Sequence, residues 1–190
     1  MWDFFTDVLL IAAVLFEYYV IYAFIRSKMG KYPPYVSTRK GMVKLLAKET
    51  EFILADESTP KNVVEPGCGN ARITICLAKK YPNHAFVGYE WDWVPYLLAK
   101  IKSCRLKNVK ILRQNFMTAD YTKTDLAILF TGNEIAQELG QKLKNDMPAG
   151  SYVVSESFEM KELPLVKTLE TGKANWFFLP QKVYFYKIEK

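Results

Sequence analysis

The chain has 190 residues, half of them hydrophobic and 15% aromatic, which excludes an intrinsically disordered protein and fits one domain with a small appendage. Three cysteines without a C-x-x-C pair and a single histidine exclude a disulfide framework, a cysteine-built zinc site and H-E-x-x-H metalloprotease chemistry. We expect that histidine, His84, to lie in a solvated turn. The net charge of +6 is concentrated, because seven basic residues and no acidic one lie between Arg26 and Lys48.

Residues 8–25 form the most apolar stretch of the chain. As a helix, these 18 residues would span about 27 Å, close to the thickness of a bilayer's hydrocarbon core. Glu17 opposes insertion, but the surrounding Leu, Ile, Val and Phe residues offset its cost. We therefore expect residues 1–30 to hold a transmembrane anchor that contacts the lipid bilayer through residues 8–25. An amphipathic or buried helix packed on the body is the alternative.

The charges that flank this segment predict its orientation. Asp3 and Asp7 precede it and the basic block follows it, which places residues 31–190 on the cytoplasmic or organellar matrix side. A basic start and a small-residue cleavage site are both missing, so we expect an uncleaved single-pass anchor rather than a signal peptide. Anionic head groups would account for the basic block, and no nucleic acid partner is expected.

Beyond the anchor, hydrophobic patterns of helix and strand alternate. A segment at residues 31–58 precedes the domain proper and includes a helix over 38–55, with Ser37 or Thr38 as N-cap. Further helices are predicted over 71–81, over 93–106 with Asp92 as N-cap, and over 133–146. Strands are predicted over 63–65, 85–90, 109–114, 126–130, 152–158, 176–179 and 183–188, the last two as a closing hairpin. This order predicts an α/β fold with a doubly wound, mostly parallel seven-stranded sheet within residues 31–190.

The first predicted strand ends in a glycine-rich turn that reads Glu65-Pro66-Gly67-Cys68-Gly69-Asn70-Ala71-Arg72. Glycines at 67 and 69 permit a tight turn and let a ligand approach the backbone, ahead of a helix N-terminus. A dinucleotide fingerprint would need glycine at position 72, where this chain has Arg72. Nicotinamide and flavin cofactors are therefore disfavoured.

Glu90 ends the second predicted strand, 21 residues after Gly69. At that distance an acidic side chain can accept hydrogen bonds from both hydroxyls of a ribose. A helix-entry carboxylate is the alternative interpretation. Trp91 follows directly and could pack on an adenine face, or lie exposed or in the core.

The spacing from Glu65 to Ala71 resembles E/D-x-G-x-G-x-G, the first motif of class I S-adenosylmethionine methyltransferases, with alanine at the third glycine. The chain further resembles the small membrane-anchored, seven-strand lysine methyltransferases that modify ATP synthase subunit c or the adenine nucleotide translocase. Besides that motif, the similarity rests on residues 34–38, which read P-Y-V-S-T, on 87–90, on 114–116 and on 129–155.

This resemblance implies S-adenosylmethionine as cofactor and no metal. It implies that Glu65, Gly67 and Gly69 hold the methionine end, with Cys68 among the cofactor-binding residues. Glu90 would hold the ribose, and Asn115 the adenine unless it is a turn asparagine. Tyr35 and Thr38 would close over the site. Glu134 is the catalytic candidate, as the carboxylate that accepts the proton of a lysine acceptor.

The implied function is membrane-anchored protein-lysine N-methylation of a membrane protein, such as a subunit c-like protein. The chain departs from the family at two places: Ala71 replaces a glycine of the cofactor motif, and Thr131-Gly132-Asn133-Glu134 stands where the family has G-V-P-[EQ]. The second departure, in which only Glu134 fits, leaves the identity of the acceptor open. Two alternatives stay open. The chain could methylate a membrane-soluble small molecule, or it could be an inactive cofactor-binding scaffold for the assembly of a membrane complex.

Overall fold

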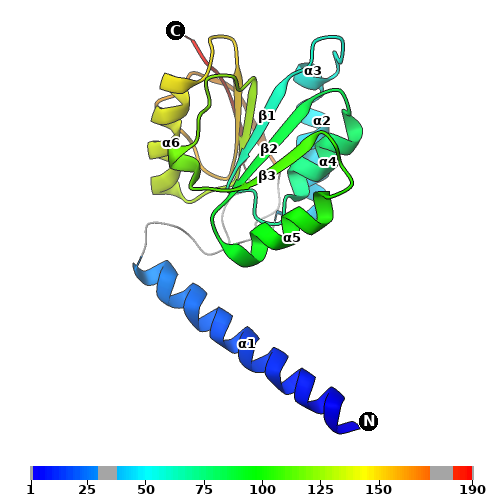
Figure 1. The fold of residues 1–190 in the computed structure, drawn as a ribbon. Helices are drawn as coiled ribbons and strands as arrows, with labels where there is room; N and C mark the ends of the chain where they lie inside the picture. Colours follow the sequence, from blue (N-terminus) through cyan, green and yellow to red (C-terminus); the bar gives the residue numbers. More distant parts are fainter. Residues whose placement is uncertain (1, 30–37, 172–181, 190) are drawn as a thin grey trace. The chain divides into compact units, whose positions relative to one another are not determined.

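The computed structural model describes residues 2–29, 38–171 and 182–189, and the chain divides into two units, residues 1–34 and 35–190. The first unit holds α1 (Trp2–Met29), drawn in blue in Figure 1. Within it, Phe4–Tyr22 is long and apolar enough to cross a membrane, by length and composition. Large apolar side chains are exposed on all sides of this helix, and Glu17 is exposed among them. A helix that is apolar all round is typical of a buried or membrane-spanning segment.

The second unit is built on a seven-stranded, mostly parallel sheet, as predicted, and its strand order is β3-β2-β1-β4-β5-β7-β6. The strands are β1 (Asn62–Pro66), β2 (Ala85–Glu90), β3 (Val109–Arg113), β4 (Leu126–Leu129), β5 (Tyr152–Glu156), β6 (Leu165–Glu170) and β7 (Lys182–Lys187). Strands β1 to β5 pair in parallel, whereas β7 runs antiparallel to both β5 and β6. The strand order reverses between β1 and β4, and ligands of such sheets bind at the carboxyl ends beside this reversal.

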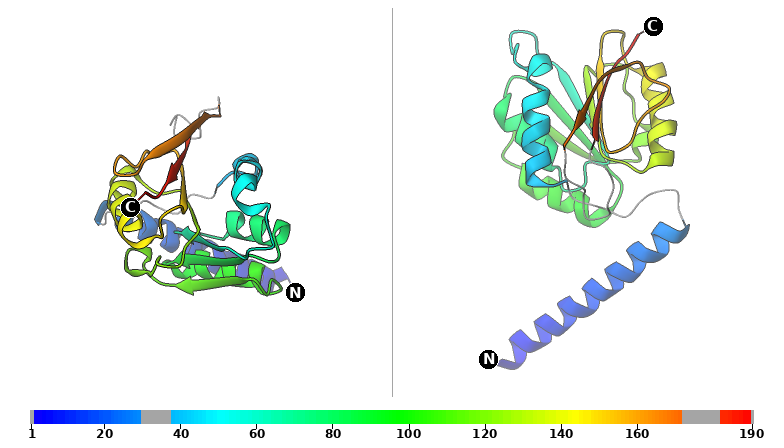
Figure 2. Two further views of the ribbon diagram at one scale, coloured as in Figure 1. Left: turned by 90° about the horizontal axis from the view of Figure 1, so that it is seen from above. Right: turned by 180° about the vertical axis from the view of Figure 1, so that it is seen from behind.

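Helices cover both faces of the sheet (Figure 1, Figure 2). They are α2 (Lys40–Glu49), α3 (Glu51–Leu54), α4 (Arg72–Lys80), α5 (Trp93–Ser103), α6 (Asn133–Asp146) and the short 3-10 helix η1 (Phe116–Thr118). Val63 of β1 packs in one core with Leu46 of α2, and its neighbour Val64 packs in another with Leu139 of α6. Because successive strand residues point to opposite faces, the apolar run of β1 serves both cores.

The helix predicted over residues 38–55 is in fact two helices, α2 and α3. Thr50 separates them, and both its amide N–H and its hydroxyl donate to the carbonyl oxygen of Leu46. Such a hydroxyl competes with the backbone for helix carbonyls and bends the chain. The predicted N-cap is also wrong, because Arg39 occupies that position and makes no side-chain capping bond.

The closing hairpin is formed by β6 and β7. Strand β7 confirms the strand predicted over 183–188, whereas the partner predicted over 176–179 lies outside the described residues. The observed partner, β6, has an edge position in the sheet, and five of its six residues are exposed. An edge strand without a buried face carries no alternating hydrophobic pattern, so the sequence did not reveal it.

His84 is buried at 1% exposure, which contradicts the solvated turn expected for it. Its Nδ1 accepts a hydrogen bond from the Lys61 amide at 3.3 Å, and its Nε2 donates to the Leu54 carbonyl at 2.9 Å. The imidazole also stacks on Tyr81. The adjoining Pro82 and Asn83 are exposed, but the ring turns inward because it finds two backbone partners there.

We predict that Gly88→Ala destabilises the protein by about 1–3 kcal/mol. A methyl group at Gly88 of β2 would lie 2.7 Å from Cys68 Sγ and 2.9 Å from Ile111 Cδ1, so close that these buried side chains or the backbone would have to shift. Gly41→Ala is the matched control, since nothing lies within 4 Å of the added methyl and alanine favours the helix. Denaturant unfolding of the full chain in detergent measures both variants. Equal unfolding midpoints would contradict the packing described for β2.

Candidate active site

The turn between β1 and α4 has three residues in the left-handed region, Gly67 (φ 69°), Gly69 (φ 54°) and Ala71 (φ 58°). Glycine adopts this conformation freely, whereas alanine pays about 1 kcal/mol for it. Ala71 is fully buried, and its amide donates to the Cys68 carbonyl at 2.7 Å. The alanine at the third glycine of the motif therefore keeps the left-handed backbone that this turn requires.

Glu65, at the carboxyl end of β1, connects the strand to the helix after the turn. Its Oε2 accepts hydrogen bonds from the Thr74 amide, at 2.9 Å, and from the Thr74 hydroxyl. Burial raises the pKa of Glu65 to about 7, the bonds from Thr74 oppose the rise, and the Glu90 and Glu156 carboxylates add to it. The Glu90 and Glu156 carboxylates thus both lie within electrostatic reach of Glu65 at this edge of the sheet.

Glu90, at the carboxyl end of β2, is held by two backbone amides. Gly69 donates to its Oε2 and Asp92 donates to its Oε1, each at 2.8 Å. Burial raises the pKa of Glu90, and the bonds from Asp92 and Gly69 oppose that rise. The structure therefore brings Glu90 against the glycine turn, although 21 residues separate them in the chain.

Asn115 and Trp91 lie at the ends of β3 and β2. Asn115 is the N-cap of η1, and its Oδ1 accepts from the Met117 amide at 2.9 Å. The Trp91 ring is half exposed, with the Arg113 guanidinium 5.1 Å from its centroid. Glu90 pairs with Arg113 in the sheet, so β2 and β3 end at the same level. Trp91 and Asn115, which follow these strand ends, therefore lie at the same edge of the sheet as the glycine turn.

The remaining predicted residues have different settings. Cys68 is buried and packs with Ala71, Ala99 and Ile111, so its thiol belongs to the core. The Thr38 carbonyl accepts a hydrogen bond from Arg72 at 3.0 Å, which places it beside the start of α4. Glu134 is exposed in the first turn of α6. Tyr35 lies outside the described residues.

Sequence reasoning missed a group of polar residues at the ends of β4 and β5. Within the described ranges, three buried atoms there make no hydrogen bond: Thr131 Oγ1, Glu156 Oε2 and Ser157 Oγ. The last register pair of these strands is Leu129 with Ser155, so all three residues lie just past it. The sequence pointed to Glu90 because it is an acidic residue at the end of an apolar strand. The same pattern in Val153-Val154-Ser155-Glu156 could have pointed to Glu156.

Burial raises the pKa of Glu156 to about 7, and the nearby Arg39 guanidinium opposes the rise. Unpaired polar atoms inside a protein cost free energy unless a ligand or water completes them. The carboxyl ends of β4 and β5 therefore offer one acidic and two hydroxyl groups for a polar ligand.

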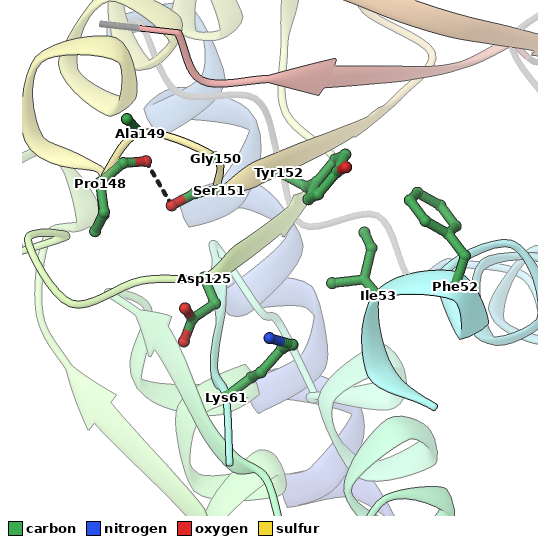
Figure 3. Close-up of a pocket in the computed structure, with 9 residues that line it drawn as sticks. All are labelled: Phe52, Ile53, Lys61, Asp125, Pro148, Ala149, Gly150, Ser151 and Tyr152. Atoms are coloured by element: carbon green, nitrogen blue, oxygen red, sulfur yellow. Dashed lines mark hydrogen bonds between the residues drawn. The ribbon is translucent and has the colours of Figure 1, made fainter. Parts of the chain in front are cut away.

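A separate pocket of about 310 Å³ lies at the opposite edge of the sheet, at the amino ends of β4 and β5 (Figure 3). Lys61, Asp125 and Tyr152 line it, together with residues 148–151. Figure 3 shows the Ser151 hydroxyl donating to the Pro148 carbonyl, at 2.7 Å, within the loop that closes one side. None of the predicted site residues lines this pocket.

We predict that Glu156→Gln changes how stability depends on pH. The folded protein holds the Glu156 proton to about pH 7, whereas an unfolded carboxyl releases it near 4.5, so stability present at low pH is lost as pH rises through this window. The loss for this group is up to about 3 kcal/mol. The variant should lose less stability than the wild type between about pH 5 and pH 8, measured by unfolding in detergent. Glu162→Gln, at an exposed position, should behave as the wild type, and identical pH profiles for all three proteins would refute the burial effect.

Comparison with known proteins identifies the family. The family model described as "ANTKMT methyltransferase domain" matches residues 65–167, more than half of the chain, and begins at Glu65. A protein-lysine N-methyltransferase of Saccharolobus islandicus (strain REY15A) is 27% identical over 158 residues, which cover 82% of this chain and 93% of the relative.

Solved structures share the fold. An RNA methyltransferase from Salinibacter ruber, in complex with S-adenosyl-L-homocysteine, superposes with a TM-score of 0.70 at 22% identity and covers 82% of this chain and 95% of its own. TrmN from Thermus thermophilus has a TM-score of 0.60 at 13% identity and covers 76% of this chain and 48% of its own. The family match, the glycine turn and the seven-stranded sheet together place the chain in the ANTKMT methyltransferase domain family, as an S-adenosylmethionine-dependent methyltransferase.

Proposed function

We propose that this protein is a membrane-anchored protein-lysine N-methyltransferase that acts on a membrane protein. The observation that carries the proposal is the hydrogen bond from the Gly69 amide to the Glu90 carboxylate. This bond joins the carboxyl ends of β1 and β2, within the region that the family model matches. The Saccharolobus islandicus relative, a protein-lysine N-methyltransferase, supports lysine as the acceptor.

The residues at this edge fit S-adenosylmethionine. Gly67 and Gly69 have no side chains that would keep a ligand from the backbone. Each Glu90 oxygen accepts one amide N–H and retains a lone pair, so the carboxylate can still accept from two ribose hydroxyls. When bound, the cofactor supplies a methyl group on a sulfonium, whose transfer leaves a neutral thioether.

In this proposal the cofactor-binding residues divide by strand. Glu65, Gly67 and Gly69 at the end of β1, with Cys68 between the glycines, hold the methionine end. Glu90 holds the ribose, Asn115 binds the adenine and Trp91 packs on its face. The segment before α2 closes over the site through Tyr35 and Thr38, and the bond from Arg72 to Thr38 supports the position of Thr38 beside the turn.

The protein's contribution to methyl transfer is to orient the acceptor amine, exclude water and take up a proton. A lysine ammonium must lose a proton before its Nζ can attack a methyl group. We assign the role of proton acceptor to Glu134 at the start of α6, which follows β4 at the same edge of the sheet. Glu156 at the end of β5 is the competing carboxylate.

The membrane part of the proposal rests on α1. Its length, its apolar surface on all sides and the basic block after residue 25 support a single-pass anchor with residues 31–190 on the cytoplasmic or matrix side. An anchored enzyme has ready access to acceptors that are themselves held in a bilayer, which supports a membrane protein as substrate.

Substitution should separate cofactor binding from turnover. We predict that Glu90→Ala abolishes binding of S-adenosylhomocysteine in calorimetry. The substitution removes the acceptor proposed for the ribose hydroxyls and also the two hydrogen bonds that the Gly69 and Asp92 amides donate to that carboxylate. Glu134→Ala should keep wild-type affinity and lose about 100-fold or more in methyl transfer. The controls are Glu162→Ala and Glu138→Ala, both at exposed positions, the latter one turn further along α6. Wild-type affinity in Glu90→Ala would refute the ribose role, and loss of turnover in Glu156→Gln alone would move the proton acceptor to Glu156.

The acceptor is identified by transfer of label. Purified full-length protein in detergent is incubated with radiolabelled S-adenosylmethionine and membranes from cells that lack this gene, and the products are resolved by gel and peptide mass spectrometry. We expect a labelled membrane protein that carries methyl-lysine. Label found only in the lipid extract would replace the lysine acceptor by a small molecule, and no transfer at all would contradict the proposal.

A further inference from the structure

Helix α5 has its small residues buried and its large apolar residues exposed. Pro95, Ala99 and Ser103, spaced four residues apart, face the body. The outward side chains are Trp93, Val94, Leu97, Leu98 and Ile101, which are 42–69% exposed. Positions 94, 97, 98 and 101 share one face of a helix, so these side chains form a continuous apolar surface, called here the α5 face. An ordinary surface helix has the opposite arrangement.

Positive charge surrounds the α5 face. From Trp93 to Ala119 the sequence has six basic residues and no acidic one. All six are exposed, and they are Lys100, Lys102, Arg105, Lys107, Lys110 and Arg113. Five of them lie on α5, after it or on the face of β3 toward it, whereas Lys110 shares the opposite face of β3 with Leu112. The Arg113 guanidinium lies 4.0 Å from the centroid of the Trp93 ring, and Tyr96 packs edge-on against that ring. An apolar and aromatic surface thus lies among basic side chains.

This combination matches one kind of partner. Clustered exposed aliphatic residues mark an interaction surface. Nucleic acid would meet the basic and aromatic groups but would leave Val94, Leu97, Leu98 and Ile101 in contact with phosphate or water. Helices that lie in a membrane interface have apolar and Trp side chains on one side and Lys or Arg around them, which complement acyl chains and anionic head groups.

We propose that the α5 face is a second membrane contact, made by the methyltransferase domain itself and independent of α1. The helix lies along an anionic leaflet, with its aliphatic residues at the acyl boundary and its basic residues among the head groups. Because α5 begins directly after the end of β2, this contact brings the edge with Glu90 close to the bilayer surface. An acceptor that emerges from the membrane would then meet the site at that surface.

The test places a fluorescent reporter on the α5 face of the full-length protein. In a Cys76→Ser/Cys104→Ser background, which leaves only the buried Cys68 thiol, Leu97→Cys carries the reporter and Gln141→Cys on α6 is the matched exposed control. Both are reconstituted into phosphatidylcholine vesicles, with and without phosphatidylserine, that contain lipids with spin-labelled acyl chains. We expect about twofold or stronger quenching at position 97, greater with phosphatidylserine, and little at position 141.

Leu98→Glu/Ile101→Glu in the Leu97→Cys protein should reduce the quenching to that of the position 141 control, since two carboxylates oppose both the apolar and the anionic contact. Equal quenching at positions 97 and 141, in protein that still floats with the vesicles, overturns the α5 contact and leaves the α1 anchor intact. A blue-shifted but unquenched reporter at position 97 would show that protein covers the α5 face. Protection of the reporter by added RNA would show that nucleic acid covers it. Either result also overturns the proposal. Methyl transfer is measured in a separate assay, so that failure of the α5 contact is distinguished from failure of the proposed function.

Discussion

The hydrogen bond from the Gly69 amide to the Glu90 carboxylate is the contact on which the candidate site depends. It holds the turn after β1 against the end of β2, and a second bond from Asp92 fixes the other carboxylate oxygen. The turn can reach Glu90 because positions 67, 69 and 71 adopt left-handed backbone. The acidic group is thus oriented by backbone donors before any ligand binds, which reduces the ordering that binding requires.

Buried negative charge is the second organising feature. Glu65, Glu90 and Glu156 end three strands of the same sheet, and burial raises the pKa of each. Their mutual repulsion contributes to the rise at Glu65. A bound cation would relieve both effects. A sulfonium cofactor and an amine acceptor are cationic ligands of this kind, so the electrostatics of the edge agree with the chemistry of the family.

The proposed membrane contacts arise from two different helices. In α1 the apolar residues surround the helix, as a spanning segment requires, whereas in α5 they occupy one face with basic residues around it. The two helices are therefore suited to different positions, across the bilayer and along its surface. The sequence predicted a helix over 93–106, which α5 confirms, but its hydrophobic periodicity could not show which side is buried. Periodicity identifies an apolar stripe without saying what covers it.

The sequence by itself determined the α/β class, six of the seven observed strands, most element boundaries and the residues at the ends of β1, β2 and β3. Local patterns carry that information, because an apolar run followed by glycines or a carboxylate needs no distant partner to be recognised. Only the tertiary structure decided the break at Thr50, the buried His84, the edge strand β6 and the unpaired Glu156. The break at Thr50 comes from a local hydrogen bond of its buried hydroxyl to Leu46, a choice between helix and bend that the apolar pattern does not encode. The other three depend on burial or on contacts between residues far apart in the chain, which leave no periodic signal in the sequence.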